Sequence, residues 1–173
     1  MPSYHGGMTT WLLLVALAQQ PTPPDKPAIL AAMKEVSFLV GEWEGEGWKL
    51  IAGKREPSKV SERVEWQAGG TVLSINGHGK NSEGATVHEA YGVMFFDLKT
   101  KEYRLRTFLS DGNTGDFKAE AKEGVITWHL PSTRPIRYTI RLDEKGRWFE
   151  VGEVNTSGET WLKFMEMTLT KKN

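Results

Sequence analysis

The sequence predicts an all-β protein: an antiparallel meander closed into a barrel of about ten strands, with one short N-terminal helix. Beyond Val40 the chain consists of short strand candidates separated by short turns. Such turns leave no room for crossover helices, so neighbouring strands must run antiparallel. A sheet of this many strands tends to close on itself, because closure removes its unpaired edges.

The N-terminal segment has the pattern of an export signal. Residues 11–18 (WLLLVALA) are apolar and end in a small-x-small pattern that signal peptidase accepts. This run is too short to span a bilayer, which needs about 20 residues. We therefore expect residues 1–18 to be a cleaved signal peptide and the protein to be secreted or periplasmic, without a membrane anchor. An apolar leader that stays attached is the alternative, because no Lys or Arg precedes the run.

The chain after the signal is expected to form one domain. Residues 19–26 form a proline-rich linker, and residues 27–173 form the barrel domain. A helix is predicted over residues 27–38, because Pro27 suits a first helical turn and the following residues favour helix. Its apolar stripe consists of Ile29, Leu30, Met33 and Val36.

The strand candidates are bounded by Gly, Asn, Asp and Ser residues, which tolerate positive φ or bond their own backbone. They cover residues 42–51, 59–67, 71–80, 86–97, 102–110, 116–121, 125–130, 135–142, 148–155 and 160–170. The first candidate alternates strictly: Glu42, Glu44 and Glu46 share one face, and Trp43 and two glycines share the other. Three carboxylates on one face belong in solvent, so we expect Trp43 to point inward. Glycine there lets the sheet coil tightly or leaves space beside the backbone.

Composition excludes several classes of function. Lys and Arg together number 22, as do Asp and Glu, so the formal net charge is zero. A nucleic-acid partner is not expected, because such binding needs a cationic surplus. The chain has no cysteine, which excludes disulfides, thiolate zinc sites and thiol catalysis. His88-Glu89 begins like a metalloprotease motif, but position 92 is Gly, so we expect no metal site.

The segment at residues 38–47 (FLVGEWEGEG) resembles the opening of lipocalin-like barrels of the calycin group. It is most similar to nitrobindin-type barrels and to a related family of uncharacterised bacterial proteins. Further segments that resemble this bacterial family lie at residues 87–93, 136–142, 148–153 and 164–169. The resemblance spans residues 36–170, and it implies a barrel with an internal pocket for a small, largely apolar ligand.

In nitrobindins the ligand is haem, held by a histidine from the C-terminal part of the barrel. The histidines of this chain are His5, His78, His88 and His129, and none lies beyond residue 129. The axial ligand therefore has no counterpart here, and we expect no haem or other cofactor. His129 could hold haem only if it faced inward. The opposite face of its strand is the more apolar one, so we expect His129 to face outward.

These observations predict a protein that binds a small hydrophobic or amphipathic molecule inside the barrel. The predicted ligand-binding residues are Trp43, Glu89, Tyr91, Arg106, Trp128, Tyr138, Glu150 and Met165. Two alternatives remain open. One is an enzyme, with haem-dependent peroxynitrite or peroxide chemistry or with an acid–base site at Glu89 or Glu150. The other is a barrel whose lumen is filled by side chains and which acts through its surface.

Carboxylates embedded in apolar strands have two interpretations. Glu89, Glu150 or Glu153, and Glu166 lie on strands near those that carry Arg104, Arg106, Arg137 and Arg141. In one interpretation they form a polar cluster that anchors a ligand in the lumen. In the other they form a cross-strand charge ladder on the outer wall, which is a common way to stabilise a sheet exterior. We favour the ladder.

Overall fold

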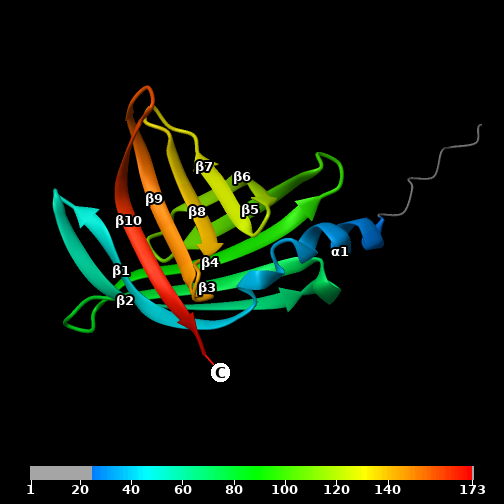
Figure 1. Ribbon diagram of the computed structural model, residues 1–173, viewed down its shortest axis with the longest axis horizontal. Helices are drawn as coiled ribbons and strands as arrows, with labels where there is room; N and C mark the ends of the chain where they lie inside the picture. The colour runs from blue at the N-terminus through cyan, green and yellow to red at the C-terminus, as the bar shows by residue number, and fades with distance from the viewer. Residues whose placement is uncertain (1–24, 173) are drawn as a thin grey trace, which may run out of the picture.

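The computed structural model describes residues 25–172 and is a closed barrel of ten antiparallel strands with a short helix against one end (Figure 1). Each strand pairs with the next along the chain, and β10 pairs with β1 to close the wall. The predicted fold class is therefore confirmed. The predicted signal peptide (1–18) and nearly all of the predicted linker (19–26) lie outside the described residues.

The elements match most of the predicted ranges. The helix α1 (Lys26–Lys34) is followed by the 3₁₀ turn η1 (Ser37–Leu39), and a second turn, η2 (Ala68–Gly70), joins β2 to β3. The strands are β1 (Gly41–Ile51), β2 (Lys54–Gln67), β3 (Val72–Lys80), β4 (Thr86–Asp97), β5 (Glu102–Leu109), β6 (Thr114–Lys122), β7 (Val125–Leu130), β8 (Ile136–Leu142), β9 (Trp148–Ser157) and β10 (Thr160–Lys171).

The helix α1 closes one end of the barrel. It begins after Asp25, whose side chain accepts a hydrogen bond from the Ala28 amide, and it ends four residues before the predicted end. From there η1 continues the chain, so that Met33, Val36 and Leu39 are all buried. Two inner side chains hold this plug in place. Tyr103 Oη donates to the Ala32 carbonyl at 2.7 Å, and Trp43 Nε1 donates to the Leu39 carbonyl at 2.7 Å.

The start of β2 is the largest error in the predicted elements. The strand begins at Lys54 rather than at residue 59 and pairs with β1 over the whole length of β1. A tight turn at Ala52 and Gly53, both with positive φ, joins the two strands. The segment before Lys59 is too polar to show a buried face, and its pairing with β1 makes it a strand. Pro57 lies opposite Trp48 in this ladder.

Among the described residues, no helix is long and apolar enough to cross a membrane.

Candidate functional site

The inner face of the barrel is buried at one end and reached by solvent at the other. Near α1, the inward-facing Trp43, Trp148 and Leu169 are each at most 1% exposed. In the half away from α1, inward-facing side chains are only half-buried, and this half is called the open half here. Its half-buried residues include Val60, Phe117, Leu130, Tyr138, Phe164 and Met165. The β1–β2 and β9–β10 hairpins lie on this side, away from α1 (Figure 1).

Three aromatic rings form a continuous surface inside the open half. Trp128 and Tyr138, directly opposite each other on β7 and β8, stack with ring centroids 5.0 Å apart. Phe164 meets Tyr138 edge-on at 5.7 Å. We call these three residues the aromatic shelf. Gly152 lies beneath it, and a Cβ there would be 2.9 Å from Tyr138 Cε1, so glycine lets the shelf pack against the wall.

Two carboxyl groups lie at the floor of the open half. Glu62 on β2 is 8% exposed and Glu150 on β9 is 7% exposed. Burial, together with the charge of Glu150, raises the pKa of Glu62 to about 8. Burial raises the pKa of Glu150 to about 7, although its hydrogen bond from Trp148 Nε1, at 3.2 Å, opposes this shift. Burial and the Glu150 charge also raise the pKa of Tyr138 to about 12. Glu150 therefore interacts with both Glu62 and the aromatic shelf.

Glycines provide the room around these carboxyls. Gly77 lies directly opposite Glu62 on β3, and a Cβ there would be 2.6 Å from Glu62 Oε1. The strands between Glu62 and Glu150 are β1 and β10, and here the inner face of β1 carries Trp43, directly opposite Glu62, followed by Gly45 and Gly47. The floor is therefore formed partly by bare backbone.

The structure places five of the eight predicted ligand-binding residues on the inner face. Trp43 lies deep beside α1, where its ring meets Trp148 edge-on at 5.8 Å. Trp128, Tyr138, Glu150 and Met165 lie in or below the open half. A role for these five in ligand binding stays a prediction.

The other three predicted residues lie on the outer wall, which corrects their assignment to the lumen. Tyr91 is 42% exposed, and the Glu89 side chain is also exposed, 4.0 Å from His78. Arg106 Nε binds Asp116 Oδ2 at 2.8 Å outside the barrel. The reason is strand parity: Gly92 and Met94 face inward on β4, so the odd-numbered residues beside them face outward. β4 carries apolar residues on both faces, and this hid its parity in the sequence.

The charge ladder on the outer wall is present. Arg104 and Arg106 on β5 both bind Asp116 on β6, and Arg137 Nε binds Glu153 Oε2 at 2.8 Å across β8 and β9. Glu150 is not part of this ladder, because it faces inward. The two interpretations of the embedded carboxylates therefore apply to different residues, to Glu153 on the outer wall and to Glu150 inside.

Sequence reasoning missed Glu62 and Phe164. Glu62 carried a usable signal, because it lies between Val60 and Val64 in the alternation of β2, and both valines face inward. Phe164 carried none. A register shift between Lys163 and Met165 lets both Phe164 and Met165 face the interior, and such a bulge depends on the pairing with β9.

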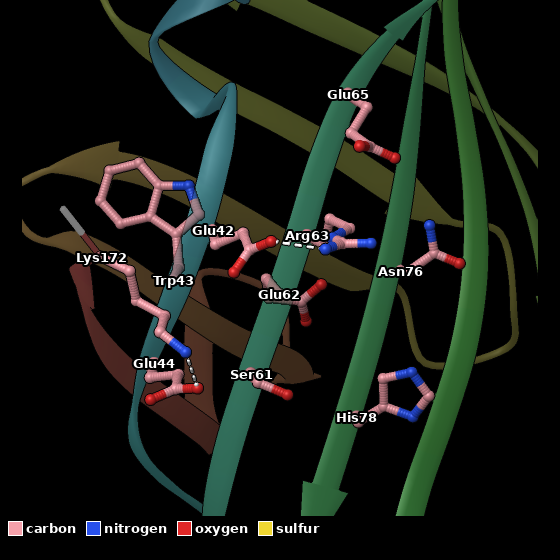
Figure 2. Close-up of a pocket in the computed structure, with 10 residues that line it drawn as sticks. All are labelled: Glu42, Trp43, Glu44, Ser61, Glu62, Arg63, Glu65, Asn76, His78 and Lys172. Carbon is pink, nitrogen blue, oxygen red and sulfur yellow. Dashed lines mark hydrogen bonds and ion pairs between the residues drawn. The ribbon is translucent and has the colours of Figure 1, made fainter.

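Two depressions lie outside the lumen. A groove of about 420 Å³ is lined mainly by outward-facing side chains of β1, β2 and β3 (Figure 2). Its Glu42–Arg63 and Glu44–Lys172 ion pairs are exposed, so the charges offset each other in water. A second depression of about 400 Å³ lies beside α1, next to Leu30 and Trp66. Trp43 and Glu62 also line the first groove, whereas neither depression includes Glu150 or the aromatic shelf.

The described histidines do not fit the haem site that the nitrobindin resemblance implies. His78 and His129 share the outward parity of their strands, opposite Glu89 and Arg137 respectively. His88 has inward parity but lies exposed near the rim. We therefore derive no chemistry through haem. Within residues 25–172 no group of three His, Cys, Asp or Glu residues could hold a metal ion.

Comparison with solved structures supports the fold. The crystal structure of Rv2717c from M. tuberculosis is similar with a TM-score of 0.60 and 12% identity, over 82% of this chain and 98% of that one. Lobster apocrustacyanin A1 and apocrustacyanin C2 are similar at TM-scores of 0.35, with 10% and 8% identity over 86% of this chain and 69% of each of theirs. No protein-family model matches the sequence, and the search of curated proteins found no match. The closed barrel fold is confirmed, whereas the relations to the calycin group and to nitrobindins stay predictions.

Proposed function

We propose that the protein binds a small amphipathic molecule inside the open half of the barrel, which the ligand enters from the end away from α1. The observation that carries this proposal is the change in burial along the inner face. Side chains near α1 pack into a closed core, whereas apolar and aromatic side chains of the same inner face remain half-buried beyond it. Apolar surface that water reaches inside a concave wall is typical of a ligand site.

The chemistry of the open half suits a ligand with an apolar body and one polar end. Apolar atoms that the aromatic shelf removes from water contribute about 25 cal/mol per Å² of buried surface. The polar end would meet the carboxyl groups at the floor, which fix its orientation. The barrel wall holds the aromatic shelf and the carboxyl groups in place before the ligand binds, which lowers the entropy lost on association.

The proposal can be tested by filling the open half. Val60 faces inward opposite Gly45 and Gly79, which carry no side chains, so an indole ring at this position would project into the open half. We expect the neutral dye Nile red to bind the native protein saturably and one to one, with a blue-shifted emission. Val60→Trp should weaken this binding at least about tenfold, because it occupies the same apolar surface.

The control is Lys59→Trp, which adds the same ring one residue away on the exposed outer face. It should bind Nile red like the native protein. Equal binding by native protein and Val60→Trp would place the dye elsewhere and overturn the proposal. Absence of saturable binding to the native protein would also overturn it and would favour a protein that acts through its surface.

A further inference from the structure

We propose that the polar end of the ligand is a hydrogen-bond-donating cation, a primary or secondary ammonium, and that it binds between Glu62 and Glu150 at the floor of the open half. This inference rests on the proposed function and names the ligand class of that same site. It predicts an amine carried on an apolar, preferably aromatic, body.

The carboxyl oxygens at the floor are hydrogen-bond acceptors with few donors from the protein. Glu62 Oε2 is fully buried and has no hydrogen-bond partner among the described residues. Within residues 25–172, the Glu150 carboxyl accepts one side-chain hydrogen bond, from Trp148 Nε1. An ionised carboxylate is an acceptor only, and leaving a buried acceptor unpaired is costly. An ammonium supplies up to three donors and a compensating positive charge.

The protein also places no cation beside these carboxyls. Within residues 25–172, neither Glu62 nor Glu150 forms an ion pair with Lys, Arg or His. The titratable group that faces them from β8 is Tyr138, which adds no positive charge. Where the pair is ionised, it therefore repels a ligand that carries a carboxylate, and a neutral ligand leaves the negative charge uncompensated.

The remaining titratable groups of the inner face lie at its two ends. The groups that share the inward parity but are exposed near the rim are Lys49 on β1, Lys54 and Glu56 on β2, and His88 on β4. At the α1 end, Tyr103 donates its hydroxyl to the Ala32 carbonyl, and the exposed Lys171 lies over the Trp43 ring. On the two strands between the carboxyls, Trp43 lies opposite Glu62 and Met167 lies opposite Glu150, and the inner face there also carries Gly45, Gly47 and Leu169. The floor is therefore an anionic site within an apolar wall.

The aromatic shelf also favours a positively charged ligand. Trp128 and Tyr138 present a stacked pair of rings on the same inner face as Glu150. The charge of Glu150 contributes to the raised pKa of Tyr138. Aromatic faces attract ammonium groups, most strongly where water is excluded. Gly77 has no side chain opposite Glu62 on β3, and a Cβ there would collide with the Glu62 carboxyl. The carboxyl groups and the aromatic rings therefore both favour an ammonium group.

Binding should depend on pH in a defined direction. Without a ligand the two carboxyls take up protons near neutral pH, because their pKa values are raised to about 8 and about 7. The ammonium requires the ionised form, so its binding should release protons. Affinity for an amine should therefore rise between about pH 6 and pH 8, whereas affinity for a neutral analogue should stay constant.

The experiment compares three ligands that share one ring system: 1-naphthylmethylamine, 1-naphthylmethanol and 1-naphthoate. Each displaces Nile red from the native protein at pH 8, and isothermal titration calorimetry measures the affinities directly. We expect the amine to bind at least about tenfold more tightly than the alcohol, and the carboxylate to bind weakest. The Glu62→Gln/Glu150→Gln variant should reduce the amine preference to less than about threefold and leave alcohol binding unchanged.

Glu153→Gln is the matched control, because it removes a carboxylate from the same strand as Glu150 but on the outer wall. It should retain the amine preference. If the alcohol binds in the lumen as tightly as the amine, the inference fails while the proposed function stands. If the double variant keeps the full amine preference, the assigned residues are wrong. If Nile red binding itself fails in the native protein, the proposed function fails first.

Discussion

Glu62 places a carboxyl group where little water reaches it, so its ionisation opposes folding. In the unfolded chain its pKa is near 4.5, and in the folded protein burial raises the pKa to about 8. Between these values the folded state holds a proton that the unfolded state has released. The free energy of unfolding therefore falls as pH rises from about 4.5 to about 8, by at most about 1.4 kcal/mol per pH unit for this group.

This predicts that Glu62→Gln stabilises the protein at pH 8. The amide keeps the shape of the side chain and removes the charge, so we expect a gain of about 1 to 3 kcal/mol at pH 8 and a far smaller change at pH 5. Urea unfolding at both pH values measures it. Glu65→Gln, on the exposed face of the same strand, should change stability little at either pH. A loss of stability at pH 8 in Glu62→Gln would contradict the argument.

At the scale of the elements, the seam between β1 and β10 joins two strands that are far apart in the sequence. Gly45 lies opposite Leu169, and a Cβ at Gly45 would collide with the Thr168 carbonyl oxygen. This contact is with backbone, which cannot rotate away as a side chain can. Glycine at this position is therefore what allows the two strands to close the barrel.

Gly45→Ala should therefore destabilise the protein strongly, by about 2 to 4 kcal/mol, because the two backbones must separate. Gly92→Ala is the matched control. It also lies on an inner strand face, and its Cβ would meet its nearest atom at 3.4 Å, an ordinary contact. Thermal unfolding followed by circular dichroism compares the two. Equal melting temperatures for the two variants would show that the seam tolerates a side chain.

At the scale of the whole molecule, the barrel combines a closed core at one end with an open half at the other. Every strand runs through both parts, so local stability should change along each strand. In β9, Trp148 and Glu150 are buried beside the plug of α1, whereas the last residues of the strand are exposed. The open half should therefore open to solvent more often than the α1 end.

Hydrogen exchange should reveal this difference. We expect the amides of residues 148–150 to exchange at least about tenfold more slowly than those of residues 154–157, although both segments belong to the same ladder. Residue-resolved exchange by NMR measures the rates. Ligand binding in the open half should slow the second segment more than the first. Uniform protection along β9 would contradict the proposed division of the barrel.

The sequence by itself determined the strand number, the antiparallel order and the helix, because turn residues and period-two alternation are local signals. It also placed Tyr138 on the inner face by alternation, whereas for Glu150 it left the lumen and the outer-wall ladder both open. Local signals failed where both faces of a strand were apolar, as around Tyr91, or where a bulge shifted parity, as at Phe164.

Only the tertiary structure decided that Glu62 and Glu150 share one floor. The two residues lie on β2 and β9, which become near neighbours because β10 closes the sheet against β1. Strand register across that seam depends on contacts between residues at opposite ends of the chain, and no local pattern encodes it. The burial that raises both pKa values arises from this closure and from α1, which seals the end of the barrel below the floor.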